Sequence, residues 1–381
     1  MMSIRKITAD SVHTITNGEI KNGVIIIDDK GKILEIGNRV NYDNSTLEVY
    51  EGSICPGFIN AHCHLELSHL KNEIAPRAGL VNFITQLMKK RFEIPIEQRL
   101  HAIELAENEM IKNGIIAVGD ISNETISIQQ KAKQKLFYHT FIETVGLNPV
   151  IANERYHEAI LLQQKFSNQN LRTTIAPHAP YSTSIQLINL IFNACKITTI
   201  HNQESFAETN FFLNKTGDFI DFYQQLNLPI DYFKPTGISS LKTILSEQNE
   251  QQNILFVHNT FTEKSDIAWI KKNVANAFLC ACPSANLFIE NTLPDYNLWF
   301  NDVENICIGT DSLASNNSLS IWNEINVIKN KFPQISMNQL LKCATYNGAK
   351  FLEIEDWAGS IEIGKTPGLN LLFENKCEPI L

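Results

Sequence analysis

Residues 59–70 read INAHCHLELSHL, which places three histidines, a cysteine and a glutamate within eight positions. His62 and His64 are separated by one residue, so on a β-strand both side chains would point to the same face. Cys63 would point the other way, toward packed helices, as a small inert core residue. A His-x-His pair alone is a weak signal, since two such histidines are often surface or core residues. Its meaning therefore depends on the fold that surrounds it.

The middle of the chain contains eight apolar, β-branched runs separated by helix-like stretches. The runs are SICPGFINAHCH, GIIAVGDIS, LFYHTFIETVG, RTTIAPHAP, KITTIHNQE, NILFVHNT, NAFLCACPSAN and NICIGTDS. Continuous apolar runs are typical of strands buried on both faces of a parallel sheet. Eight of them alternating with helices predict an α/β fold, a distorted (β/α)8 TIM barrel. No GxGxxG follows the first run, so a dinucleotide-binding sheet has no fingerprint here.

Both ends of the chain differ from the middle. The first 50 or so residues alternate short β-like runs with turns, and the DDKGK segment between two apolar runs indicates a hairpin. The closing segment GSIEIGKTPGLNLLFENK has the same character. We therefore expect a small composite β-sandwich domain formed by residues 1–54 and 356–381, with the barrel over 55–355.

Composition sets limits on function. Among 381 residues, 44% are hydrophobic and 19% charged, and the formal charge is −9. A nucleic-acid or anionic-membrane partner would favour a basic surface, so we expect neither. No apolar run approaches the roughly 18 residues of a membrane span, and the N-terminus lacks a signal-peptide core. The expected partner is a small-molecule substrate in the cytoplasm; a homodimer remains open.

Eight cysteines in such a chain are expected to be reduced thiols rather than a disulfide framework. The closest pair, Cys280 and Cys282, lies in an apolar run and is predicted to be core.

The eight runs end in ionisable residues far more often than chance would give. In order, these are His62 with His64, Asp120, Glu143, His178, His201, His258 and, on the eighth, Asp311. The chemistry of a (β/α)8 barrel sits at the carboxyl ends of its strands, and ionisable groups there cost free energy unless paired or bound to a cation. Three imidazoles and one carboxylate, His62, His64, His201 and Asp311, suit one Zn²⁺, with Fe²⁺ as the alternative.

Two further residues are candidates for acid–base chemistry. Glu204 follows His201 by three positions, where a carboxylate could reach an activated water and shuttle its proton. Its alternative role is a helix-start glutamate interacting with the helix dipole. His258 closes an apolar strand; it could be a hydrogen-bonded core histidine or a partner of the attacking oxygen.

Together, the segments PGFINAHCHLE, APHAPYS, HNQES, VHNT, CPSANL and GTDSLASNN resemble the amidohydrolase superfamily, in particular its mononuclear deaminase branch. The resemblance covers essentially the whole chain. It implies a metal held by His62, His64, His201 and Asp311, with Glu204, His258 and Asp311 catalytic. Dinuclear relatives use a carboxylated lysine on the fourth strand, where this chain has His178, so one metal is expected.

The resemblance also bears on the substrate. APHAPYS and CPSANL are similar to S-adenosylhomocysteine and methylthioadenosine deaminases, but Asn82 stands where that group carries a ribose-binding glutamate. The HLELSHL segment is more similar to aminodeoxyfutalosine deaminases, which act on a related adenine nucleoside. The expected substrate contacts are Glu66, Ser68, His69, His178 and Asn82.

Two other classes of function compete with nucleoside deamination. The same barrel could hydrolyse a cyclic amide or a chloro-heterocycle, as imidazolonepropionase-, guanine deaminase- or chlorohydrolase-like enzymes do, and ammonia release would separate most of these. A barrel that has lost catalysis is a remote alternative, because such proteins usually lose metal ligands.

Overall fold

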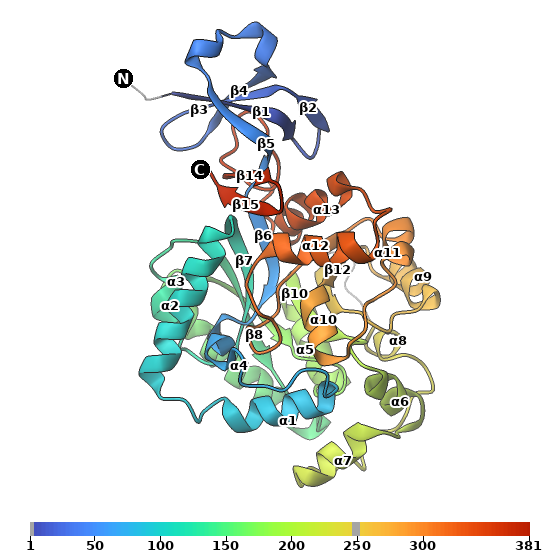
Figure 1. Ribbon diagram of the computed structural model, residues 1–381. Coiled ribbons are helices and arrows are strands. Elements are labelled where there is room, and N and C mark those ends of the chain that lie inside the picture. The colour runs from blue at the N-terminus through green and yellow to red at the C-terminus, as the bar shows by residue number, and fades with distance from the viewer. Residues whose placement is uncertain (1–3, 246–251) are drawn as a thin grey trace.

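The computed structural model describes residues 4–245 and 252–381, and Figure 1 shows two parts. A small β-sheet that carries both chain ends lies at one end of the molecule, and a larger α/β unit forms the rest. Strand β5 (Glu48–Pro56) leads almost directly into β6 (Phe58–Cys63), which joins the two parts. The small sheet therefore lies at the amino-terminal end of β6.

Each of the eight predicted apolar runs forms a strand of the larger unit. These strands build two four-stranded parallel sheets, in the orders β6-β7-β8-β9 and β10-β11-β12-β13. The strands after β6 are β7 (Ile115–Ser122), β8 (Phe137–Thr144), β9 (Arg172–Pro177), β10 (Ile197–Asn202), β11 (Asn253–His258), β12 (Asn276–Ala281) and β13 (Ile306–Ile308). The predicted α/β class with parallel strands is confirmed.

The edge strands of the two sheets contact each other on both sides. Between β9 and β10, the His201 amide donates to the His178 carbonyl at 2.9 Å. Between β13 and β6, the amides of Thr310 and Asp311 donate to the His62 carbonyl, each at 3.1 Å. Gly309 permits this approach, because a Cβ there would lie 2.8 Å from the His62 carbonyl oxygen.

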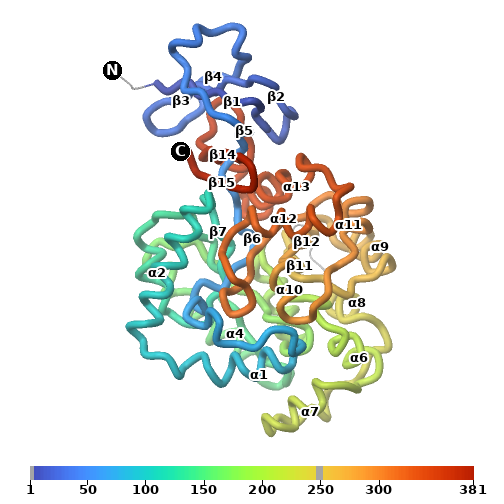
Figure 2. The backbone as a smooth tube through the Cα atoms, in the orientation of Figure 1, coloured from blue at the N-terminus to red at the C-terminus, as the bar shows by residue number. Residues whose placement is uncertain are grey.

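Helices surround the strands and follow most of them along the chain (Figures 1 and 2). The α-helices are α1 (Leu80–Lys90), α2 (Ile96–Lys112), α3 (Ile128–Lys131), α4 (Ala152–Ser167), α5 (Ile185–Ala194), α6 (Phe206–Asn214), α7 (Asp218–Gln225), α8 (Ser240–Ile244), α9 (Lys264–Asn273), α10 (Pro283–Ile289), α11 (Tyr296–Asp302), α12 (Ile321–Lys331), α13 (Met337–Ala344) and α14 (Tyr346–Leu352). Four 3₁₀ helices are η1 (Arg39–Asn41), η2 (Asn44–Thr46), η3 (Leu65–Leu70) and η4 (Pro149–Ile151).

The side chains of β6 change partners along the strand. Ile59 and Ala61 pack in an apolar cluster with strand residues such as Phe141, whereas Cys63 packs in the cluster that includes Ile103 of α2. The change falls where the register of β6 against β7 shifts, between Asn60 and Cys63. Such an irregularity re-aims side chains. Cys63 thus contacts helix residues, as expected from the sequence, and all eight cysteines are free thiols.

Strands from both ends of the chain share one seven-stranded sheet. Its members are β1 (Arg5–His13), β2 (Glu19–Lys21), β3 (Gly23–Ile27), β4 (Ile33–Asn38), β5, β14 (Leu369–Phe373) and β15 (Lys376–Pro379), in the order β15-β14-β5-β1-β3-β4 with β2 on β1. The expected hairpin is present as antiparallel β3 and β4. Strand β5 runs through the expected domain boundary at residue 54.

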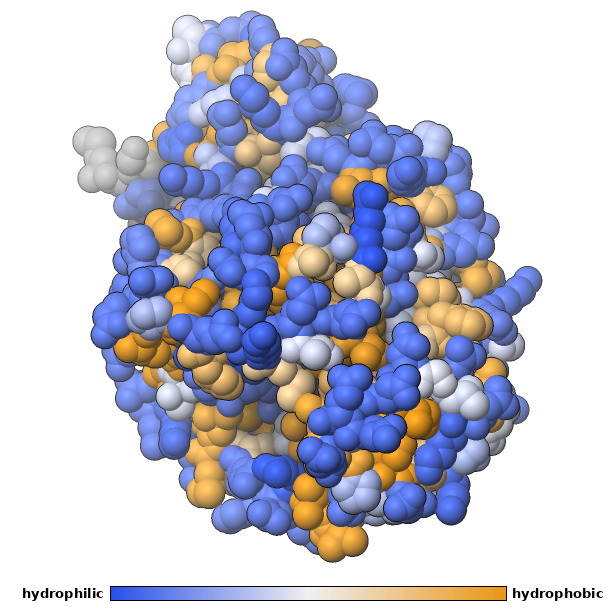
Figure 3. Space-filling view, turned by 60° about the horizontal axis from the view of Figure 1, so that its bottom comes forward, coloured by the Kyte–Doolittle hydropathy of each residue, from blue (hydrophilic) through white to orange (hydrophobic). Residues whose placement is uncertain are grey.

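The opposite end of the α/β unit carries α1 and α7 (Figure 1). Figure 3 brings this face forward and shows apolar side chains in several patches on a mostly hydrophilic surface. Across the described residues, every helix is too short or too polar to cross a bilayer.

Candidate active site

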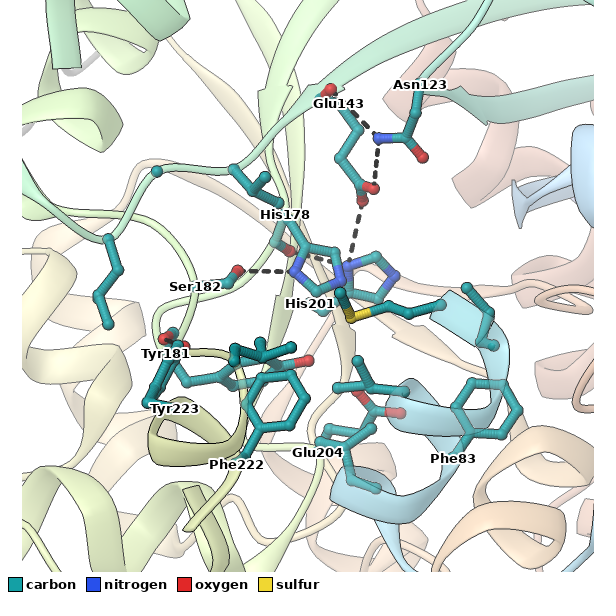
Figure 4. Close-up of a pocket in the computed structure, with 18 of the residues that line it drawn as sticks. Phe83, Asn123, Glu143, His178, Tyr181, Ser182, His201, Glu204, Phe222 and Tyr223 are labelled. Atoms are coloured by element: carbon teal, nitrogen blue, oxygen red, sulfur yellow. Dashed lines mark hydrogen bonds and ion pairs between the residues drawn. The ribbon is translucent and has the colours of Figure 1, made fainter. Parts of the chain in front are cut away.

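A cavity of about 530 Å³ opens at the carboxyl ends of the strands (Figure 4). Most of its polar wall comes from the strand ends and the loops after them, and two arginines come from the end of α1 and from α4. Much of its apolar wall comes from α1 and from α7 with the segment that follows. The polar residues are His64, Arg91, Asn123, Glu143, Asn148, Arg155, His178, Ser182, His201, Glu204, His258, Asp311 and Ser312. The volume falls within the range of small-molecule sites.

Four ligand-type side chains converge at the bottom of this cavity. His64 Nε2 lies 3.2 Å from His62 Nε2 and 3.3 Å from His201 Nε2. Asp311 Oδ1 lies 3.5 Å from His64 Nε2 and 3.7 Å from His62 Nε2. They come from β6, the residue after it, β10 and the loop after β13, so the fold brings together all four residues singled out in the sequence.

The surroundings favour a neutral His64, a neutral His201 and an ionised Asp311. Burial, followed by the charge of His62, lowers the pKa of His64 to about 4, and burial also lowers the pKa of His201. Burial alone would raise the pKa of Asp311. Hydrogen bonding with His62 and the charge of His64 outweigh burial, so the pKa of Asp311 is lowered overall. Ser315 Oγ donates to Asp311 Oδ2 at 2.6 Å.

The donor set fits a divalent metal. His201 Nδ1 donates to the His178 carbonyl at 2.8 Å, which leaves the neutral ring's Nε2 as a lone-pair donor facing the other two histidines. Metal-binding histidines usually fix their ring by such a bond from the second nitrogen. The His62 and His201 nitrogens and the Asp311 oxygen each lie within 3.5 Å of His64 Nε2. Three nitrogens and one carboxylate oxygen are a ligand set that zinc accepts. Asp311 has φ of 55°, a strained value of the kind found at functional sites.

Glu204 and His258 lie next to these four residues. His258 Nε2 is 3.5 Å from Glu204 Oε1, and His258 Nδ1 donates to Asn286 Oδ1 at 2.8 Å. Burial lowers the pKa of His258 to about 4. Burial first, and then the charges of Asp311 and Glu208, raise the pKa of Glu204 well above its ordinary value. The pair therefore combines a neutral imidazole with a carboxyl group that readily takes up a proton.

The turn that carries Glu204 is held by the start of α6. Glu208 Oε1 and Oε2 accept the amides of Gln203 and Glu204 at 3.0 and 3.2 Å. Ser205 is the N-cap of the helix, and its side chain accepts the Glu208 amide at 3.2 Å. Glu204 is thus part of a fixed turn immediately before the N-cap of α6.

His178 and Glu143 form another side of the cavity (Figure 4). His178 Nδ1 shares a hydrogen bond with Ser182 Oγ at 2.6 Å. Glu143 Oε2 accepts from Asn123 Nδ2 at 2.9 Å, and Oε1 lies 3.6 Å from His201 Nδ1. Burial would raise the pKa of Glu143, but the nearby His178 and His64 outweigh it and lower that pKa.

Four of the five expected substrate contacts do not line the cavity; only His178 does. Asn82 is exposed on α1 and donates to the Ala78 carbonyl, because the helix turns it outward. Ser68 donates to the Leu65 carbonyl at 2.7 Å, and His69 donates to the Arg91 carbonyl at 3.0 Å. The 3₁₀ helix η3 buries both against neighbouring backbone, so the structure corrects the prediction of direct contact.

Glu66 acts one layer behind the cavity wall. It is fully buried, pairs with the Arg91 guanidinium and accepts the amides of Asn123 and Glu124. Burial raises its pKa to about 7 despite Arg91. Its contacts position Arg91 and Asn123, which do line the cavity, so Glu66 supports the site without touching its interior.

The sequence did not predict the part of the cavity wall that is formed by two arginines and by apolar helix residues. Arg91 and Arg155 line the cavity, with apolar residues from two helices, and the two arginines come from the C-cap of α1 and from α4. The apolar lining includes Leu80, Phe83, Leu87, Phe222, Tyr223 and Leu226. Apolar helix residues of this kind are normally core, so nothing in their local pattern marks them as cavity wall.

Comparisons with known proteins agree with this geometry. The model of the amidohydrolase family matches residues 53–379. An adenosine deaminase of Helicobacter pylori is 28% identical over 91% of this chain and 86% of its own length. An aminodeoxyfutalosine deaminase of a Nitratiruptor species is 26% identical over 87% of this chain and 82% of its own.

A solved structure of a deaminase is also similar to this chain. The crystal structure of Helicobacter pylori aminofutalosine deaminase in complex with methylthio-coformycin superposes with a TM-score of 0.80 and 25% identity. The match covers 98% of this chain and 93% of that one.

Proposed function

Because the chain belongs to the amidohydrolase family, we propose that it is a metal-dependent hydrolytic deaminase that releases ammonia from an adenine-type nucleoside. The observation that carries the proposal is the closeness of His62, His64, His201 and Asp311 to one another, beside the Glu204–His258 pair that lines the cavity. The relatives named above for adenosine and aminodeoxyfutalosine support this substrate class, and we propose an aminodeoxyfutalosine- or methylthioadenosine-like nucleoside.

In this proposal, His62, His64, His201 and Asp311 hold one divalent metal, Zn²⁺ by preference and Fe²⁺ as the alternative. When bound, such a metal makes water available as a nucleophile at neutral pH. The eight strands form the distorted barrel that presents these ligands at one mouth.

The residues around that water carry the proton transfers. Glu204 takes a proton from the attacking water and passes it to the ring nitrogen, which makes the neighbouring carbon a better electron acceptor. His258 faces the water through Nε2, since Asn286 fixes its Nδ1–H. The oxygen of water adds to the amidine carbon, the carbon–nitrogen bond breaks, and the amine departs as ammonia after Asp311 helps return a proton. A ring carbonyl remains.

His178 contacts the bound substrate in this proposal, because its ring lies in the cavity wall with a centroid 4.9 Å from that of His201. Ser182 holds the ring through Nδ1 and leaves Nε2 for the ligand.

A substrate screen tests the function. Purified protein loaded with Zn²⁺ should release ammonia from adenosine, methylthioadenosine or aminodeoxyfutalosine, and much less from guanine, cytosine or pterins. Turnover restricted to non-nucleoside bases would remove the nucleoside proposal. Chloride release from a triazine, or ring opening of a cyclic amide without ammonia, would favour the other hydrolases of the family instead.

A further inference from the structure

One carboxylate oxygen of Glu143, Oε1, is a hydrogen-bond acceptor that the proposed reaction does not use. Its side chain is only 6% exposed, and in the described part of the chain Asn123 Nδ2 is the one hydrogen-bond donor to its carboxylate, at Oε2. His201 Nδ1 lies 3.6 Å from Oε1, and its hydrogen is already donated to the His178 carbonyl. Among the described residues, Oε1 therefore lacks a donor.

A carboxylate oxygen with a free lone pair is stabilised when a donor reaches it, and hydrogen bonds to charged groups are the stronger ones. Glu143 lines the cavity, so a ligand can supply that donor. Figure 4 shows Glu143 and Asn123 on one side of the His178–His201 pair and Glu204 on the other, so two ends of one ligand can reach the two carboxylates together.

Other acceptors in the polar wall are already engaged. Glu204 and Asp311 belong to the proposed reaction, Asn148 Oδ1 accepts the Val150 amide, and Ser182 Oγ pairs with His178. The Asn82 side chain, expected from the sequence to meet the sugar, points out of the cavity.

We propose that Glu143, oriented by Asn123, binds the vicinal hydroxyls of the substrate's sugar. A carboxylate offers lone pairs on two oxygens, and two neighbouring O–H groups match them. Glu143 is thus a specificity-determining residue for a ribonucleoside over its deoxy analogue. The inference rests on the proposed deaminase function and extends it to the sugar.

Paired substrates test this role. The unaltered protein should have a kcat/KM for adenosine about 10- to 100-fold above that for 2′,3′-dideoxyadenosine, the range expected for hydrogen bonds to a charged group. Glu143→Gln should reduce the ratio to below about threefold, mainly by slowing adenosine. Asn123→Ala, which keeps the carboxylate and removes its orienting amide, should reduce it part of the way. Glu154→Gln, the same change on the exposed face of α4, should leave it unaltered.

The ratio separates sugar recognition from a structural role beside His201. If Glu143 only positioned His201, Glu143→Gln would slow both substrates equally and weaken metal retention; that result, or an unaltered protein without preference, would overturn the inference. Binding of inosine against 2′,3′-dideoxyinosine, measured by calorimetry, gives a readout independent of turnover. If no adenine nucleoside releases ammonia, the proposed function is refuted. The inference about Glu143 is still decided by calorimetry: the unaltered protein should bind inosine more tightly than 2′,3′-dideoxyinosine, and Glu143→Gln should lose this preference.

Discussion

Glu204 illustrates how burial sets the chemistry of single residues in this protein. Its carboxyl group shares a dry region with Asp311 and Glu208, and this environment raises its pKa. Next to it, burial keeps His258 neutral. A carboxyl group that readily gains a proton, beside an imidazole that does not, is suited to move protons between water and a ring nitrogen.

Replacing Glu204 with Gln should reduce ammonia release from adenosine by about 10²- to 10⁴-fold, because the amide cannot transfer the proton. Metal content, measured by mass spectrometry, should match the unaltered protein, since Glu204 is outside the proposed ligand set. Near-normal turnover in this variant would exclude Glu204 from proton transfer.

Asp120 and Lys131 form a buried ion pair behind the site. Both are fully buried, and Lys131 Nζ lies 2.5 Å from Asp120 Oδ2 and 3.0 Å from the hydroxyls of Ser122 and Thr140. Asp120 Oδ1 accepts the amide of Leu65, the residue after His64. The pair therefore fixes the backbone beside a proposed ligand.

Lys131→Met should destabilise the protein by about 3–5 kcal/mol in urea unfolding, because it leaves Asp120 buried and unpaired. Lys133→Met removes a half-exposed lysine paired with Glu104 and should cost less than about 1 kcal/mol. An equal loss of unfolding free energy in the two variants would contradict a stabilising role for the buried Asp120–Lys131 pair.

At the scale of elements, the start of α6 connects secondary structure to chemistry. Ser205 caps the helix, and Glu208 in its first turn holds the amides of Gln203 and Glu204. Because the same turn carries Glu204, loosening the helix start should displace the carboxyl group from His258.

Ser205→Ala should cost about 1 kcal/mol of stability, as loss of an N-cap commonly does, and should also lower kcat. Ser336→Ala is a matched control, since Ser336 caps α13 with a similar bond to the Gln339 amide at 3.3 Å, away from the cavity. It should cost similar stability and leave kcat unaltered. Loss of activity in both variants would mean that the effect is general destabilisation.

At the scale of the whole molecule, the proposed ligands span the two parallel sheets. His62 lies on β6 of one sheet, and His201 lies on β10 of the other, with Asp311 in the loop after β13. A bound metal would therefore tie the two sheets together.

Removing the metal with a chelator should lower the thermal unfolding midpoint, and added Zn²⁺ should restore it. A ligand that binds only the folded state contributes about 2.7 kcal/mol when its free concentration is 100-fold above Kd. The His201→Ala variant should lose this response to Zn²⁺. A midpoint that is identical with and without metal would argue against the proposed ligand set.

Buried carboxyl groups also set how stability varies with pH. Burial raises the pKa of Glu324 to about 7, where it accepts from the Ser284 amide and Asn316 Nδ2 at 2.9 and 2.8 Å. A folded pKa above the unfolded value of about 4.5 means that the folded state holds the proton more tightly. Its contribution is present below pH of about 4.5 and is lost as pH rises through about 7.

Glu324→Gln should remove this dependence, so between pH of about 4.5 and 7 the variant should gain up to about 3 kcal/mol relative to the unaltered protein. Urea unfolding across that range measures the difference. Glu154→Gln, on an exposed position, should give a curve parallel to that of the unaltered protein. A Glu324→Gln curve that is also parallel would contradict the raised pKa.

The sequence by itself determined the eight strands, the hairpin of β3 and β4, and the ionisable residues at the strand ends. Continuous apolar runs have few alternatives to a buried parallel strand, and residues at the carboxyl ends of such strands share one mouth. His62, His64, His201 and Asp311 could be grouped for this reason, although they are spread over most of the chain.

The tertiary structure alone decided which other residues face the cavity. Asn82 turns outward on α1, η3 buries Ser68 and His69 against backbone, and Glu66 is turned to Arg91. A helix packs according to all of its neighbours, and local periodicity does not encode which helix covers the cavity. Strand ends are fixed by the backbone ladder, whereas the contacts of loops and covering helices depend on packing between distant segments.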